Sequence, residues 1–137
     1  MSARAEPRGT LPASARVKKR REYQEIQSRG QRLPLPHFVL IVAARDPDDA
    51  HGPRLGITAS RKIGGAVQRN RAKRLVREAF RATRELFPPD IDVVVIVRTN
   101  LGALRLADVV AELRSAEGAL SQRIARARRE RGAKRGP

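Results

Sequence analysis

The amino-acid sequence predicts an α+β domain in which helices pack on one sheet of about four strands. Apolar residues between positions 68 and 86 recur with helical spacing on one side only. Residues 91–97 form an almost unbroken β-branched run of strand length, and two shorter runs rich in β-formers precede them at 37–44 and 54–60. A chain of 137 residues has room for one core. The resulting order is α-β-β-β-α-β-α.

The first element is a basic helix over residues 14–29, which Gly30 ends as a C-terminal cap. Few of its residues can enter a core, namely Val17, Tyr23 and Ile26. Residues 1–13 contain prolines and little apolar surface and predict a flexible basic leader.

Strands follow this helix. The Leu-Pro-Leu-Pro connector at 33–36 is extended and is a candidate for a short edge strand, because proline interrupts regular pairing. Residues 37–44 and 54–60 read as strands, and the Asp-, Pro- and Gly-containing segment between them has turn chemistry. These two strands are expected to pair as a hairpin.

The second half of the predicted domain begins with a glycine-containing loop and a helix over 68–86, stopped by Pro88 and Pro89. The strand at 91–97 is apolar at almost every position, which is typical of a central strand covered on both faces. A last helix runs from about residue 107 into the 120s. The inner face of the 68–86 helix comprises Ala72, Leu75, Val76, Ala79, Phe80 and Thr83, and that of the last helix Val110, Leu113, Leu120 and Ile124.

The domain is therefore expected to span residues 14–125, followed by a disordered basic tail at 126–137. The chain carries 30 Lys+Arg against 14 Asp+Glu, a net charge of +16. A surplus of this size on a small body indicates a polyanionic partner, either nucleic acid or an anionic membrane.

Several classes of protein are disfavoured. No stretch approaches the roughly 20 apolar residues of a spanning helix, and no apolar signal-peptide core is present, so a cytoplasmic protein is expected. Cysteine is absent, which excludes disulfides and thiolate metal sites. Aromatic residues make up only 3%, so phosphate contacts rather than base stacking should dominate nucleic-acid affinity.

On the 68–86 helix the polar residues divide into two basic flanks on either side of the apolar stripe. Only Glu78 and Glu85 interrupt the positive charge. One flank holds Asn70, Lys73, Arg77 and Arg84, and the other holds Arg71, Arg74 and Arg81. Two phosphate-binding faces would explain this pattern, since Arg suits bidentate phosphate contacts. An ordinary amphipathic helix in a basic protein would explain it as well.

The segment before this helix favours the phosphate-binding interpretation. Arg61 and Lys62 directly follow a strand, and Gly64 and Gly65 allow close backbone approach to a ligand. The loop then enters a helix N-terminus, which itself attracts anions. Two cations, two glycines and a helix N-terminus therefore lie together in this segment.

These residues resemble the protein subunit of bacterial ribonuclease P. That family has a Leu-Gly-Ile strand, a Ser-(Arg/Lys)-Lys segment, and the signature Arg-Asn-Arg-x-Lys-Arg-x-x-Arg-(Glu/Gln)-x-Phe. This chain has Leu55-Gly56-Ile57, Ser60-Arg61-Lys62, and residues 69–80 in the same order and spacing. The resemblance extends from about residue 11 to residue 124.

The resemblance implies a non-catalytic role in a ribonucleoprotein. In this family the RNA subunit cleaves precursor tRNA to mature its 5′ end. The protein binds that RNA, holds the 5′ leader of the substrate, and raises affinity for metal ions and substrate. The fold is an α/β sandwich, a single mixed sheet with a left-handed β-α-β crossover. Mg²⁺ would be held mainly by RNA, with no catalytic residue, metal ligand, small-molecule substrate or membrane contact in the protein.

The family's functional positions map onto two sets of residues here. The set expected to face the catalytic RNA is Arg61, Arg69, Arg71, Arg74 and Arg81. The set expected to line the leader cleft is Tyr23, Val39, Ile41, Lys62, Asn70, Lys73 and Arg77. The helical wheel agrees with the family pattern except at Arg69, which falls near the apolar edge.

Two positions depart from the family pattern. Gln27 stands where the family often has a second aromatic residue on the first helix, and Ile41 stands where it often has Tyr. A leader base could pack on Ile41, but base–aromatic stacking is worth about 1–3 kcal/mol per base. Leader binding in this chain is therefore expected to depend more on charge and to be more sensitive to salt.

Other polar residues do not indicate catalysis. His37 and His51 lack ligand spacing, and the Asp residues at 46–49 are typical of a turn. Asp90 and Asp92 flank a strand as nuclease carboxylates can, but no further carboxylate is placed to join them. Two alternatives remain, a ribosomal protein or RNA chaperone, which the charge would fit, and a protein nuclease.

Overall fold

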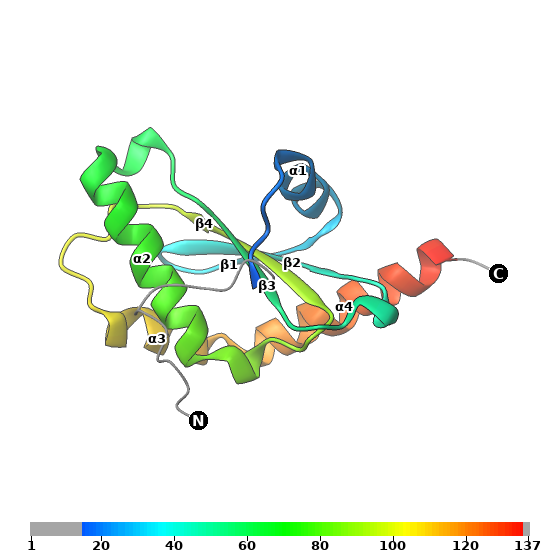
Figure 1. Cartoon of the computed structure of the whole chain (residues 1–137). Helices are drawn as coiled ribbons and strands as arrows, with labels where there is room; N and C mark the ends of the chain where they lie inside the picture. Colours follow the sequence, from blue (N-terminus) through cyan, green and yellow to red (C-terminus); the bar gives the residue numbers. More distant parts are fainter. Residues whose placement is uncertain (1–14, 136–137) are drawn as a thin grey trace, which may run out of the picture.

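The computed structural model describes residues 15–135 and places four strands in one mixed sheet (Figure 1). The strands are β1 Gln31–Pro34, β2 Phe38–Ala44, β3 Arg54–Thr58 and β4 Ile91–Val97. The α-helices are α1 Arg20–Arg29, α2 Ala66–Ala82, α3 Leu106–Ser115 and α4 Glu117–Arg135. Short 3₁₀ turns, η2 Pro47–Asp49, η3 Arg61–Ile63 and η4 Arg84–Leu86, join them. The element order is the predicted one, with the last helix divided in two at Ala116.

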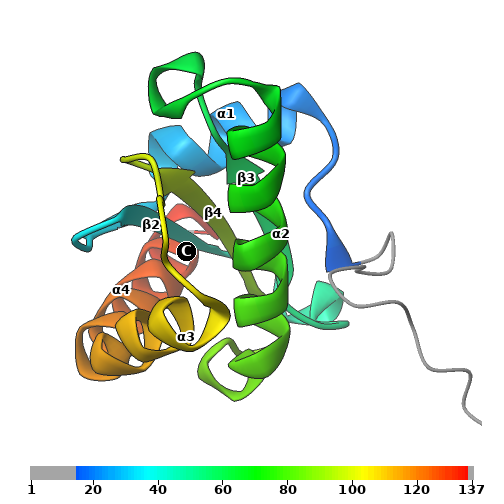
Figure 2. The ribbon, with the colours of Figure 1, turned by 90° about the vertical axis from the view of Figure 1, so that its left-hand side faces the viewer.

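The sheet separates two apolar clusters. The larger cluster lies between the sheet and α2, α3 and α4, and the smaller one lies between the sheet and α1 (Figures 1 and 2). β4 contributes to both, because Val93 and Val95 enter the larger cluster while Val94 enters the smaller one. This confirms the prediction of a central strand buried on both faces. The predicted apolar stripe of α2 is also buried, including the hydroxyl-bearing Thr83.

The strand order is β1-β2-β4-β3, so the predicted hairpin between the second and third strands is wrong. β2 pairs antiparallel with β4, and β3 pairs parallel with the other edge of β4. The segment between β2 and β3 is longer than the roughly 2–5 residues of a hairpin loop, which lets the chain step across one strand position. β4 occupies the position between β2 and β3, so the most apolar strand has a hydrogen-bonded partner on each edge.

The edge strand proposed at the Leu-Pro connector exists as β1, which pairs antiparallel with β2. The β3-α2-β4 unit is the parallel crossover that the family resemblance implies. Its left-handed sense stays a prediction.

The boundaries of two helices differ from the predictions. α1 begins at Arg20 rather than at residue 14, because residues 16–19 are not helical and bind the edge of β3, where the Val17 N–H donates to the Leu55 carbonyl at 3.0 Å. α2 begins at Ala66 and ends at Ala82, and residues 84–86 form a separate 3₁₀ turn.

The expected disordered tail is wrong for residues 126–135, which continue α4. Burial of Ile124 and Ala127 against the core carries the helix past the expected end of the domain. The expected leader at 1–13 and the last two residues, 136–137, lie outside the described residues.

Candidate nucleic-acid interface

A cationic groove runs along the free edge of β3, between α1 and α2. One hollow of about 170 Å³ is lined by Arg16, Val17, Tyr23, Leu55, Ile57, Lys73 and Arg77. A second hollow of about 500 Å³ continues along α1 and is lined by Lys18, Arg20, Tyr23, Gln24, Gln27, Ile57 and Thr58. Tyr23 and Ile57 belong to both hollows, which therefore meet at these two side chains. We call the combined surface the α1–α2 groove.

Tyr23 stands at the centre of the groove because β3 has no side chain beneath it. A Cβ atom at Gly56 would lie 2.7 Å from the Tyr23 Cε1 atom, so the ring rests directly on the strand backbone. The Tyr23 hydroxyl accepts the Ile57 N–H at 3.2 Å. Because β3 is an edge strand, this bond also satisfies a backbone donor that no neighbouring strand reaches.

The first turn of α1 is anchored to β3 by Glu22. Its carboxylate accepts the backbone N–H groups of Lys18 and Lys19, both at 3.2 Å, and accepts Arg54 Nη1 at 3.1 Å. Burial alone would raise the pKa of Glu22, but these backbone bonds and Arg54 together hold the pKa below its usual value. The ionised carboxylate therefore fixes the helix that carries Tyr23.

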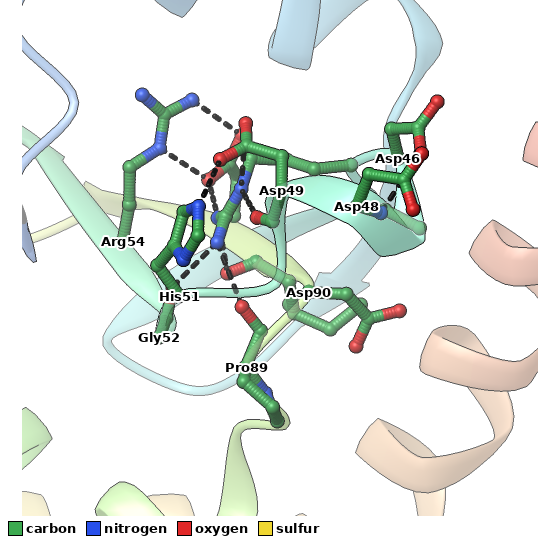
Figure 3. A network of polar contacts seen from close by, with 12 residues as sticks. Asp46, Asp48, Asp49, His51, Gly52, Arg54, Pro89 and Asp90 are labelled. Atoms are coloured by element: carbon green, nitrogen blue, oxygen red, sulfur yellow. Dashed lines mark hydrogen bonds and ion pairs between the residues drawn. The ribbon is translucent and has the colours of Figure 1, made fainter.

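Arg54 connects Glu22 to the interior of the sheet. Its Nε donates to Asp92 Oδ1 at 2.8 Å and its Nη2 to Asp92 Oδ2 at 2.9 Å, a bidentate pair that raises the pKa of Arg54. Asp92 is 1% exposed and also binds Arg45. Arg45 donates further to the carbonyls of Gly52 and Pro89, two acceptors that are labelled in Figure 3. Asp92 is thus a buried structural carboxylate shared by two arginines.

The two flanks of α2 face different surroundings, as the helical wheel predicted. Lys73 and Arg77 are half-buried and line the groove. Arg71 lies on the other flank, where its Nη2 donates to the Leu104 carbonyl at 2.5 Å in the loop before α3. Arg74 and Asn70 are exposed, while Arg69 and Arg81 are half-buried. The partial burial of Arg69 agrees with its place near the apolar edge of the wheel.

Arg61 and Lys62 lie in η3, immediately before α2, and both side chains are exposed. The Ser60 hydroxyl caps this turn by accepting the Lys62 N–H at 3.3 Å. Gly64 follows with φ +142°, a backbone angle that L side chains rarely adopt. The glycine lets the chain turn from η3 into α2, so the two cations stand at the N-terminal end of that helix.

Val39 and Ile41 do not join the groove, which corrects their expected place in the cleft. Both belong to β2 and to the cluster beneath α1, and Ile41 has no exposed surface. A methyl group added to Gly30 would overlap Ile41, which shows how closely the chain covers it. The apolar floor comes from Ile57 of β3 instead, a residue that the sequence prediction missed because the family pattern placed the apolar cleft residues on the first helix and on the strand at 37–44.

The described part of the chain, residues 15–135, contains no group of three His, Cys, Asp or Glu side chains placed to hold a metal ion. No helix in the same range is long and apolar enough to cross a membrane.

Known proteins of one family are similar to this chain in sequence. A protein-family model described as ribonuclease P matches residues 11–120. A ribonuclease P protein component from Syntrophus aciditrophicus is 44% identical over 104 residues, covering 76% of this chain and 85% of the relative. One from Desulfovibrio desulfuricans is 40% identical over 105 residues, covering 75% and 80%.

Solved structures of related proteins have the same fold. The RNase P protein from Thermotoga maritima superposes with a TM-score of 0.64 at 33% identity, covering 73% of this chain and 92% of that protein. The RNase P protein from Staphylococcus aureus gives a TM-score of 0.64 at 29% identity, covering 74% and 90%.

Proposed function

This chain belongs to the ribonuclease P protein family, and on that premise we propose which of its surfaces binds which RNA. It is the protein subunit of the ribonucleoprotein endoribonuclease that removes the 5′ leader from precursor tRNA. The family match decides against the alternatives of a ribosomal protein, an RNA chaperone and a protein nuclease.

The α1–α2 groove binds the 5′ leader as a single strand. The observation that carries this assignment is the meeting of Tyr23 and Ile57 with Lys73 and Arg77 in one hollow. Single-stranded RNA is bound by such a combination, in which a ring or apolar side chain packs on a base and cations hold the phosphates. Asn70 and Lys62 extend the polar rim of this site along α2 and η3.

The opposite flank of α2 binds the catalytic RNA subunit. Arg71 and Arg74 are exposed on that flank, and Arg69 and Arg81 stand half-buried on the same helix. Arg61 in the preceding turn joins them. Guanidinium groups suit this role because each can bind a phosphate through two parallel hydrogen bonds. One helix thus lies between the leader and the RNA that cleaves it.

Catalysis belongs to the RNA subunit, with Mg²⁺ held mainly by RNA, and the protein alone is inactive on precursor tRNA. Its place of action is the bacterial cytoplasm. The protein contributes affinity and alignment, through phosphate contacts that depend on salt concentration.

Two double variants test this division. The holoenzyme is assembled from the cognate RNA subunit and assayed at low Mg²⁺. K73A/R77A should lose the preference for precursor tRNA over leaderless tRNA while retaining affinity for the RNA subunit. R71A/R74A should lose affinity for the RNA subunit. The assignment is wrong if both variants weaken the same interaction equally.

A further inference from the structure

We propose that the C-terminal half of α4 forms a second contact with the catalytic RNA, in which Arg126 and Arg129 bind its phosphate backbone. This inference rests on the proposed function. It concerns residues 121–135, which follow the end of the family match at residue 120.

The composition of this segment is strongly cationic. Residues 121–135 contain seven Lys or Arg residues and a single acidic residue, Glu130. A solvated helix surface usually mixes both signs of charge. Cations near a helix C-terminus are favourable, but that effect is confined to about the last turn. The helix dipole therefore does not account for positive charge along the whole segment.

Part of this charge holds α4 in place. Asp90 accepts Arg128 Nη2 at 2.7 Å and Arg131 Nη1 at 2.8 Å, and Arg131 also donates to the Arg45 carbonyl at 2.7 Å. Arg123 donates to the Arg32 carbonyl at 2.9 Å. Together with the buried Ile124 and Ala127, these contacts dock one side of the helix on the sheet.

Arg126 and Arg129 lie on the other side of the helix. At about 100° per residue they fall opposite Ile124, Ala127 and Arg131, and residues three apart on a helix are neighbours. Both side chains are exposed. Neither makes a hydrogen bond or ion pair within the described part of the chain. Because the helix is already ordered by its docked side, a ligand meeting these two arginines would bind a preformed surface.

The position of α4 selects the RNA subunit over the leader. α4 packs on β1 and β2, whereas the α1–α2 groove follows β3 at the opposite edge of the sheet. Figure 1 shows α4 crossing beneath the sheet and its C-terminal end projecting past it. A strand held in the groove is separated from Arg126 and Arg129 by the width of the sheet. The RNA subunit, which already meets the outer flank of α2, is the polyanion that we assign to this surface.

The test measures the affinity of the full-length protein for the cognate RNA subunit over a range of salt concentrations. R126A/R129A should bind roughly tenfold or more weakly, as expected when charge-assisted hydrogen bonds are removed. Its salt slope should fall by about 1 for each phosphate that the variant no longer binds. R126K/R129K should retain most of the affinity. E130Q, which removes the acidic residue of this segment, should bind more tightly.

The matched control is R21A/R32A, which removes the same charge from two exposed arginines outside α4 and outside both proposed RNA-binding surfaces. Neither side chain makes a polar contact within residues 15–135. The inference is overturned if R126A/R129A binds the RNA subunit as R21A/R32A does. It is also overturned if the weakening appears only in affinity for precursor tRNA. If the wild-type protein fails to bind the RNA subunit at all, the proposed function itself is wrong.

Discussion

The Tyr23 ring occupies the space that a side chain at Gly56 would need. A Cβ atom at Gly56 would stand 2.7 Å from Tyr23 Cε1 and 2.9 Å from Cζ, closer than real Cβ contacts allow. Packing against Tyr23 therefore explains why a glycine stands in the Leu-Gly-Ile strand. It lets α1 set an aromatic ring directly on the backbone of β3 and form the centre of the groove.

Replacing Gly56 with Ala should therefore displace the ring. We expect the free energy of unfolding to fall by about 1–3 kcal/mol through overpacking, and the preference for precursor over leaderless tRNA to fall with it. Chemical denaturation and equilibrium binding measure the two effects. G118A is the control, because a methyl group there meets nothing within 4 Å. Unchanged leader preference in a folded G56A protein would contradict this role of Gly56.

Replacing Glu22 with Gln should loosen α1. Glu22 accepts two backbone N–H groups and Arg54, and we expect the change to cost about 1–2 kcal/mol in the free energy of unfolding. Because the folded state lowers the pKa of Glu22, its contribution is present above the unfolded pKa and is lost as pH falls through the folded value.

Denaturation as a function of pH measures this contribution, and E22Q should show less of the acid-dependent loss than the wild type. E25Q is the matched control. Glu25 forms an exposed i,i+4 ion pair with Arg29, with the Glu25 side chain 63% exposed, so its removal should change stability by less than about 0.5 kcal/mol. Equal effects of E22Q and E25Q would show that Glu22 does not anchor the helix.

Asp90 should make the docking of α4 sensitive to acid. The hydrogen bond from Arg128, opposed by burial and reinforced by Arg131, lowers the pKa of Asp90 to about 2. Because the folded state lowers this pKa, the ionised Asp90 carboxylate stabilises the fold at pH values above the ordinary carboxyl pKa of 3.8. The stabilisation, on the order of 1–2 kcal/mol because Arg128 is 42% exposed, is lost as pH falls from about 4 to 2.

Amide hydrogen exchange of residues 124–131 at several pH values would follow this loss locally. In the wild type, protection should decrease on acidification, whereas D90N should have low protection at every pH. D48N is the control, because the exposed Asp48 carboxylate makes no hydrogen bond or ion pair with the described residues of α4. Protection of α4 that stays high in D90N would contradict the anchoring role of Asp90.

A tyrosine at position 41 should not restore leader stacking, although the family pattern suggests it. Ile41 is wholly buried beneath α1, and a larger side chain there should cost about 1–3 kcal/mol in stability. I57Y is the informative comparison, because Ile57 lines both hollows of the groove. We expect I57Y to tighten leader binding and reduce its salt dependence. A folded I41Y protein with tighter leader binding would show that β2 reaches the leader after all.

The sequence by itself predicted the elements that depend on local periodicity. The stripe on α2 and the apolar run of β4 are both buried as expected. The same spacing placed Lys73 and Arg77 on one flank of α2 and Arg71 on the other, which the structure confirms. These patterns can be recognised because side chains in a helix or strand return to the same face every few residues, and the buried face is apolar in each repeat.

Only the tertiary structure decided which elements lie side by side. β4 separates β2 from β3, so the groove is floored by Ile57 and Ile41 is enclosed. The end of α4 is ordered by Asp90, a residue 38 positions before Arg128. Strand pairing and helix docking depend on contacts between residues far apart in the chain. Local periodicity carries no information about such partners, because it records only which side of an element is buried.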